Sequence, residues 1–158
     1  MSISASTDKR LFLGGGRPLD QGEKNHSGRL TGRCHCGAIQ YSMPAKAEHQ
    51  ALCHCSDCRR HAGAPAVAWA LVKADDVEIK GTPKLYASSE HGRRHFCADC
   101  GTSLFYSNEQ VFPGMIDIQS ATLDQPDAIP PQAQIQTAER LAYMADLNAL
   151  PAFERYPG

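Results

Sequence analysis

The sequence predicts a mainly β domain, with antiparallel sheets, few short helices and an organisation around zinc. Three observations support this prediction. Short apolar runs recur between turn residues from about residue 30 onward, no helical pattern of βαβ length separates consecutive runs, and seven cysteines fall into three spaced groups. A chain of 158 residues has room for one such domain.

Six strands are expected from the apolar runs. Turn-forming residues such as Gly81-Thr82-Pro83 and Pro113-Gly114 bound them. The expected strands cover residues 38–43, 66–72, 77–80, 84–87, 103–106 and 115–118.

Two short helices are expected. Ser56 is the predicted N-cap of one over residues 57–62, which Gly63 would end. A second is predicted over residues 137–147, where three apolar residues have helical spacing: Leu141, Met144 and Leu147.

The first 28 residues are expected to form a separate, weakly structured leader. They are Gly-rich in the middle and polar on either side, and they show no clear periodicity. The zinc-binding domain is therefore expected over residues 29–158.

The composition excludes several functional classes. Charged residues make up 21% of the chain and nearly cancel, which gives a net charge of −1, whereas nucleic-acid-binding domains are normally basic. No stretch is long and apolar enough to span a membrane, and the first 28 residues lack the apolar run of a signal peptide. We therefore expect a cytoplasmic protein with reduced cysteines, which bind metal more often than they pair. The sequence does not predict the oligomeric state.

Four cysteines form two pairs that suit a closed, structural zinc site. The pairs are Cys34-x-Cys36 and Cys97-x-x-Cys100. Zinc takes four such ligands in a tetrahedron, so pairs from distant segments would hold those segments together. Gly101 permits a tight turn after the second pair. The candidate cations beside these four thiolates are Arg33, Arg93 and Arg94.

The remaining cysteines, Cys53, Cys55 and Cys58, suit an open site. Three thiolates within six residues can hold one metal from a single loop and leave its fourth position free. Arg59 and Arg60 follow at once and favour the thiolate forms. Because three thiolates blunt Lewis acidity, such a metal suits a sulfur-containing substrate better than hydrolysis.

Other interpretations of these groups stay open at this point. Iron can replace zinc in a four-thiolate site. The three-cysteine group is also compatible with a second structural zinc that a histidine completes; the nearest are His54, His61, His91 and His95. Trp69 is expected in the core or in a pocket wall, and the candidate general bases by proximity are Asp57 and Ser88.

The cysteine motifs resemble those of the glutathione-dependent formaldehyde-activating enzyme family, which includes centromere protein V. The resemblance rests on Gly32-Arg33-Cys34-His35-Cys36-Gly37, Cys53-His54-Cys55-Ser56-Asp57-Cys58-Arg59 and Phe96-Cys97-Ala98-Asp99-Cys100-Gly101-Thr102. It covers about residues 30–153. Two positions differ from many relatives: Gln134 stands where a histidine is common, and Tyr143 is the local aromatic where a tryptophan is common.

The resemblance implies a β-tent fold and two zinc ions per chain. It assigns Cys34, Cys36, Cys97 and Cys100 to a structural zinc, and Cys53, Cys55 and Cys58 to an exchangeable one. It also implies a carbon–sulfur lyase activity that forms S-hydroxymethylglutathione from formaldehyde and glutathione.

Three hypotheses about function follow. The first is a zinc-dependent carbon–sulfur lyase that acts on a thiol adduct, with glutathione as the expected partner. The second is a non-catalytic binding module with two structural metals, which requires a fourth protein ligand on the second zinc. The third is a redox sensor, in which oxidation of the open site ejects the metal.

Overall fold

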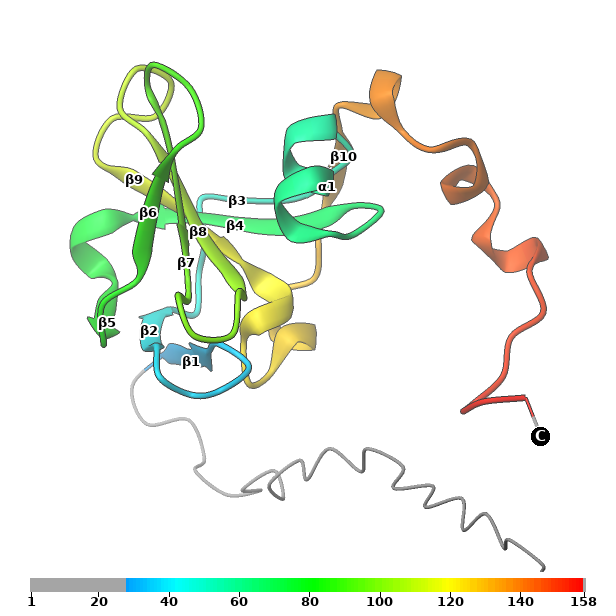
Figure 1. The fold of residues 1–158 in the computed structure, drawn as a ribbon, viewed down its shortest axis with the longest axis horizontal. Helices are drawn as coiled ribbons and strands as arrows, with labels where there is room; N and C mark the ends of the chain where they lie inside the picture. Colours follow the sequence, from blue (N-terminus) through cyan, green and yellow to red (C-terminus); the bar gives the residue numbers. More distant parts are fainter. Residues whose placement is uncertain (1–27, 158) are drawn as a thin grey trace, which may run out of the picture.

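The computed structural model describes residues 28–157, so the expected leader lies, apart from Gly28, outside the described residues. Within that range the chain forms ten strands, one α-helix and several 3₁₀ turns (Figure 1). The strands and the helix are β1 (Arg29–Arg33), β2 (Gln40–Pro44), β3 (His49–Cys53), α1 (Ser56–Ala62), β4 (Val67–Lys73), β5 (Glu78–Lys80), β6 (Lys84–Ala87), β7 (Gly92–Phe96), β8 (Ser103–Asn108), β9 (Met115–Gln119) and β10 (Ala133–Ile135). The mainly β class is confirmed.

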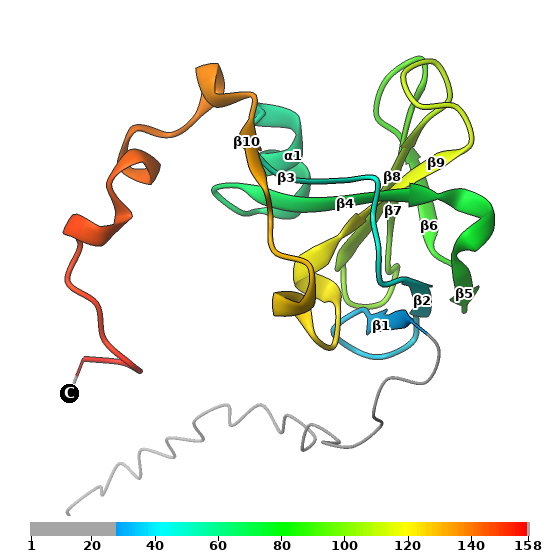
Figure 2. The ribbon, with the colours of Figure 1, turned by 180° about the vertical axis from the view of Figure 1, so that it is seen from behind.

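The strands form two sheets. The smaller has the order β1-β2-β5 and the larger the order β10-β3-β4-β9-β8-β7-β6. The small sheet lies beside one end of the large one, and β10 runs along the free side of β3 (Figures 1 and 2). All pairings are antiparallel except that of β10 with β3, where Ala133 lies opposite Ala51 in parallel register. The expectation of purely antiparallel sheets is therefore wrong at this edge.

The main core lies between the two sheets. The small sheet contributes Tyr41 and Met43, and the large sheet contributes residues of its central strands, including Phe105 and Ile118. The Tyr41 ring meets the Phe105 ring edge-on, with centroids 5.1 Å apart and planes at 80°. Ile118 and Phe105 have no exposed surface, so this packing fixes the two sheets against each other.

The six expected strands are all present with shifts of up to two residues at their ends. Strand β6 matches its expected range, and β5 begins one residue later than expected. Four strands were not expected: β1, β3, β7 and β10. Polar residues occupy much of β1 and β7, and β10 has only three residues, so none of these shows an apolar alternation.

The helix α1 was expected, but its N-cap is Cys55 and not Ser56. The Cys55 backbone is extended, with φ −61° and ψ 149°, and its sulfur accepts the backbone N–H of Cys58. A thiolate or thiol sulfur thus replaces the usual hydroxyl or carboxylate cap. Gly63 ends the helix as expected, in the left-handed conformation with φ 64°.

The helix predicted over residues 137–147 is wrong. Three separate 3₁₀ turns cover the segment instead: Thr137–Glu139, Ala142–Ala145 and Leu147–Ala149. Tyr143 and Leu147 remain 54% and 48% exposed, so the apolar face of such a helix would have no surface to pack against. A helix of this length is not stable without that packing.

None of the helices in the described part of the chain has the length and apolar character needed to cross a membrane.

Candidate functional site

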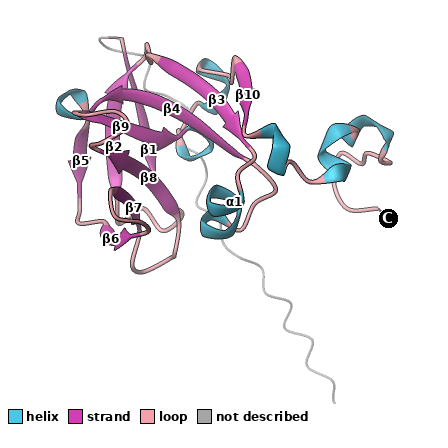
Figure 3. Cartoon of the chain, turned by 90° about the horizontal axis from the view of Figure 1, so that it is seen from above, coloured by secondary structure: helices cyan, strands magenta, loops and turns pink. Residues whose placement is uncertain are grey.

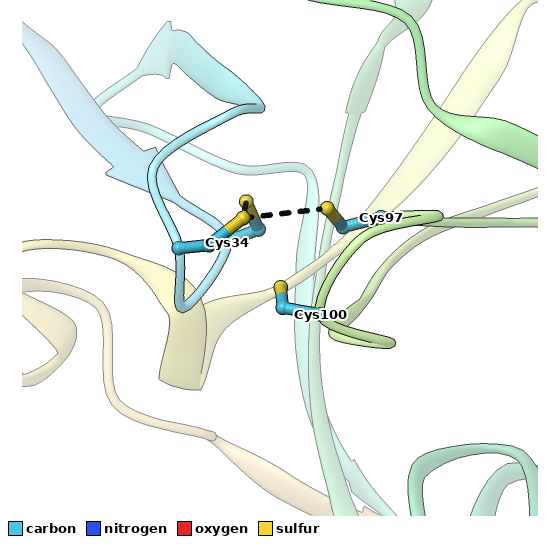
Figure 4. Close-up of side chains that lie close together, drawn as sticks. Cys34, Cys97 and Cys100 are labelled. Atoms are coloured by element: carbon cyan, nitrogen blue, oxygen red, sulfur yellow. Dashed lines mark hydrogen bonds between the residues drawn. The ribbon is translucent and has the colours of Figure 1, made fainter. Parts of the chain in front are cut away.

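Two turns bring four cysteines together at the junction of the two sheets. Cys34 and Cys36 follow β1, whereas Cys97 and Cys100 lie between β7 and β8. We call them the four-cysteine cluster. Their sulfur atoms all lie within 4.8 Å of one another, and the labelled side chains in Figure 4 point toward a common centre.

The spacing of these sulfurs fits a tetrahedral metal site. Sulfurs held about 2.3 Å from a central ion lie about 3.8 Å from each other. The Sγ atoms of Cys34 and Cys36 are 3.5 Å apart, and those of Cys36 and Cys97 are 3.7 Å apart. The residues of this cluster therefore fit zinc, or another ion of the same geometry.

Both turns are held by backbone hydrogen bonds. The Gly101 N–H donates to the Cys97 carbonyl at 2.9 Å, with Gly101 in the left-handed region at φ 75°, so the predicted tight turn is present. Each turn also has a hydrogen-bond contact to sulfur. The Ile39 N–H lies 3.2 Å from Cys34 Sγ, and the Thr102 hydroxyl lies 3.2 Å from Cys100 Sγ. Such donors offset part of the negative charge on the sulfurs.

The expected cations of this cluster lie elsewhere. Arg33 pairs with Asp124 at 3.3 Å. The Arg93 guanidinium donates to the backbone carbonyls of residues 89, 90 and 92. Arg94 contacts Cys58 of the other cysteine group. Its position in the sequence, close to Cys97, did not indicate this contact.

The three remaining cysteines form a second cluster where β3 leads into α1. Cys53, Cys55 and Cys58, the three-cysteine cluster, also have sulfurs within 4.8 Å of one another. Cys53 and Cys58 are buried, whereas Cys55 is partly exposed. The three cysteines could therefore hold a metal ion, with Cys55 at the most accessible side of the cluster.

Arg94 and Trp69 form the electrostatic surroundings of Cys58. Arg94 is 6% exposed, and its Nη2 lies 3.9 Å from Cys58 Sγ. Hydrogen bonds from the Cys53 thiol and then the Cys55 thiol, with the Arg94 charge and the Trp69 side chain, lower the pKa of Cys58 to about 5 despite its burial. Trp69 is buried here, as expected. These contacts favour the thiolate form of Cys58.

Arg94 reaches this cluster because of the strand register. Arg94 lies opposite Tyr106 on β8 and opposite Tyr86 on β6. Its guanidinium carbon sits 5.0 Å from the centre of the Tyr106 ring, a cation–π distance. The sequence gives no periodic signal for this role, because a buried arginine interrupts the apolar pattern that would reveal the strand.

A pocket of about 530 Å³ lies between α1 and the β6–β7 hairpin, and we call it the helix pocket. Arg94 is shared between this pocket and the three-cysteine cluster. Three cations and one carboxylate surround it. The lining residues are Asp57, Arg60, His61, Lys84, Leu85, Tyr86, Ser88, Arg94 and Phe96. Asp57 and Ser88, the candidate general bases, both line this pocket.

Within residues 28–157, no histidine joins the three-cysteine cluster. The Nε2 of buried His54 lies 2.9 Å from Gln134 Oε1, so Gln134 contacts this histidine and does not line the pocket. His95 packs edge-on against Phe105, and His91 lies 3.7 Å from Glu90.

His61 faces the helix pocket. Its ring lies 6.0 Å from that of Phe96 and 6.5 Å from that of Tyr86. Burial, and then the Arg94 charge, lower the pKa of His61, so its imidazole is neutral near pH 7. Its Nδ1 has no partner among the described residues.

The chain is similar in sequence or structure to several known proteins. Residues 29–139 match the family described as glutathione-dependent formaldehyde-activating enzyme. An uncharacterized lyase of Schizosaccharomyces pombe is 29% identical over 110 residues, which cover 61% of this chain and 80% of that protein. A putative glutathione-dependent formaldehyde-activating enzyme of Halomonas elongata is 28% identical over 112 residues, which cover 65% of this chain and 71% of that protein.

One solved structure extends the comparison to the fold. The crystal structure of a Rhodobacter sphaeroides protein matches with a TM-score of 0.53 and 22% identity. The match covers 66% of this chain and 99% of that chain. It therefore shows a common fold.

Proposed function

Because this chain belongs to the glutathione-dependent formaldehyde-activating enzyme family, we propose that it is a zinc-dependent carbon–sulfur lyase acting on an adduct of a small thiol such as glutathione. One observation carries the proposal: Arg94 lines the helix pocket and also lies 3.9 Å from Cys58 Sγ. A substrate in the pocket is therefore adjacent to the three-cysteine cluster. The names of the yeast and Halomonas relatives support the same reaction class.

We assign two zinc ions to the chain. The four-cysteine cluster would hold a structural ion between β1–β2 and β7–β8, and the three-cysteine cluster would hold the second. Zinc bound by three thiolates would be a soft, weakly Lewis-acidic centre, which a further sulfur ligand suits better than water. The tetrahedral sulfur spacing of the first cluster and the partial exposure of Cys55 support this division.

The pocket cations are suited to bind and orient an anionic thiol peptide. Arg60, Lys84 and Arg94 give the lining three positive charges against the one carboxylate of Asp57. Carboxylates of such a substrate pair favourably with guanidinium groups, which bind them through two parallel hydrogen bonds. Leu85 and Phe96 give the remainder of the lining an apolar surface.

His61 is the proposed proton carrier. In the lyase direction the carbon–sulfur bond of the hydroxymethyl thioether breaks, the carbon–oxygen bond becomes a carbonyl, and the hydroxyl loses its proton while the leaving sulfur gains one. The neutral His61 ring lines the pocket and is the proposed proton acceptor there. We expect it to take the hydroxyl proton and return a proton to sulfur.

Native mass spectrometry with and without glutathione tests the proposal. We expect two zinc ions per chain and a glutathione adduct. In Cys55→Ser we expect one zinc ion, no adduct, and a thermal unfolding midpoint close to that of the unmodified chain. Ser107→Ala, on β8, is the control, and we expect it to retain both zinc ions and the glutathione adduct. Formaldehyde–glutathione condensation, followed by NMR, is then lost only in Cys55→Ser.

Two outcomes would contradict the hypothesis that this chain is an enzyme. Full condensation activity in Cys55→Ser would exclude the three-cysteine cluster from the reaction. Two zinc ions with no adduct and no activity toward aldehydes would favour a closed second site, and hence the non-catalytic binding module.

A further inference from the structure

Residues 140–157, which we call the arm, leave the body of the protein after a firm anchor. Strand β10 pairs with β3, and the Glu139 carboxylate accepts the backbone N–H of Ser56 at the start of α1, at 2.8 Å. Beyond this point the chain runs outward, on the side of α1 away from β6 and β7 (Figures 1 and 3). Its short turns are closed by local hydrogen bonds.

The arm has the composition of a packed segment and not of a solvated tail. Eleven of its 18 residues are apolar, and its two arginines, one aspartate and one glutamate cancel. Disordered segments have the opposite character, with few aromatics and high net charge. Five large apolar side chains are nevertheless 48–96% exposed: Tyr143, Leu147, Leu150, Phe153 and Tyr156.

Strand β6 is a complementary exposed surface on the body. It is the edge strand of the large sheet, so one side of its backbone faces no neighbouring strand of that sheet. Leu85 and Tyr86 on this strand are 52% and 56% exposed. They form the outer wall of the helix pocket, whereas Arg94 forms the buried wall.

We propose that the arm of one copy of this chain packs against β6 of a second copy. The aromatic residues of the arm would cover Leu85 and Tyr86. Glu154 directly follows Phe153 in the arm and would lie against Lys84 at the start of β6. The apolar surfaces and these opposite charges are thus matched. The proposal does not depend on the chemistry assigned to the cysteine clusters.

The area available agrees with a stable dimer. Covering the exposed parts of the three arm aromatics buries on the order of 400 Å². Two arms contribute about 800 Å². Leu85 and Tyr86, each about half exposed, add on the order of 400 Å² over two copies of β6. The total of roughly 1,200 Å² lies at the lower end of the range of specific interfaces. A second copy is favoured over the arm's own β6 because the turns that follow Glu139 direct the arm away from that strand.

Sedimentation velocity of the full chain at several concentrations tests the proposal. We expect a species of twice 17.2 kDa, and in Phe153→Ser at least a tenfold weaker association. Val111→Ser is the matched control, since Val111 and Phe153 are both 61% exposed, and it remains a dimer. Glu154→Lys weakens the dimer, and adding Lys84→Glu to the same chain restores it.

Photo-cross-linking identifies the surfaces. A benzoylphenylalanine in place of Phe153 is expected to react with β6 in mixed samples of isotopically heavy and light chains, and to give heavy–light peptide pairs. A monomer at every concentration, a dimer that Phe153→Ser does not weaken, or cross-links within single chains only would each overturn the proposal.

Discussion

Asp117 provides a test of the electrostatics beside the three-cysteine cluster. It lies on β9, directly opposite Tyr106 on β8 and Leu71 on β4, on the face of the large sheet that also carries Trp69. Burial, and to a lesser extent the negative charge of Cys58, raise the pKa of Asp117 from 3.8 to about 7. Replacing it by asparagine removes the ionisation and preserves the shape of the side chain.

The expected gain in stability follows from proton linkage. In the unfolded chain the carboxyl ionises near pH 3.8, whereas in the folded chain it keeps its proton until about pH 7. Between these values the folded state binds more protons, so stability falls as pH rises. Above pH 7 the ionised Asp117 carboxylate lowers the free energy of unfolding by its full amount, about 4 kcal/mol. Asp117→Asn is therefore expected to be more stable than the unmodified chain by up to about 4 kcal/mol at pH 8.

Urea unfolding at fixed zinc concentration measures this effect. The stability difference between Asp117→Asn and the unmodified chain should be about 2 kcal/mol smaller at pH 5.5 than at pH 8. Taking the difference at each pH removes changes in metal binding that both proteins share. Asp75→Asn, at an exposed position, is the control and should show no such trend. A variant less stable at pH 8, or a difference independent of pH, would refute the reasoning.

Three further predictions concern the core, the helix end and the buried arginine. Phe105→Ala, which removes a fully buried ring, should lower the free energy of unfolding by about 4 kcal/mol in urea titrations. Gly63→Ala places a side chain at φ 64° and should cost about 1 kcal/mol in the same assay. Arg94→Met removes a charge that lowers the pKa of Cys58, so protons compete better for that thiolate. Native mass spectrometry over a pH series should then show that Arg94→Met loses the proposed second zinc at a higher pH than the unmodified chain does. The control Arg93→Met should match the unmodified chain.

The division of the cysteines into two clusters was predictable from their spacing. Cys53, Cys55 and Cys58 lie within six residues, so almost any local conformation keeps them close. The pairing of the Cys34 turn with the Cys97 turn depended on the chemistry of four-ligand sites, which leaves few other partners for two isolated pairs. Within each of the two groups, the sulfur atoms lie within 4.8 Å of one another.

The surroundings of the clusters were not predictable in the same way. Strand β7 has the sequence Gly-Arg-Arg-His-Phe, which lacks an apolar alternation because its buried positions are Gly92 and Arg94. That burial is compensated by Cys58 and Tyr106, which come from distant parts of the chain. The N-cap by Cys55 was missed for a related reason, since sulfur is a rare cap and Ser56 follows it directly.

Strand β7 runs from one cluster to the other, and we expect it to couple their metal affinities asymmetrically. The strand carries Arg94 to Cys58 and continues into Cys97, whose partner Cys36 lies 61 positions away in the sequence. With zinc bound as proposed, Cys36→Ser releases the end of β7 and with it the position of Arg94. Loss of such an outer contact typically weakens metal binding 10–100-fold, so we expect the second zinc to bind about tenfold or more weakly in Cys36→Ser. Cys55→Ser removes only a local cluster and should leave the four-cysteine zinc unchanged. Competition with a chelator measures both affinities, and an unchanged second site in Cys36→Ser would show that β7 does not transmit the change.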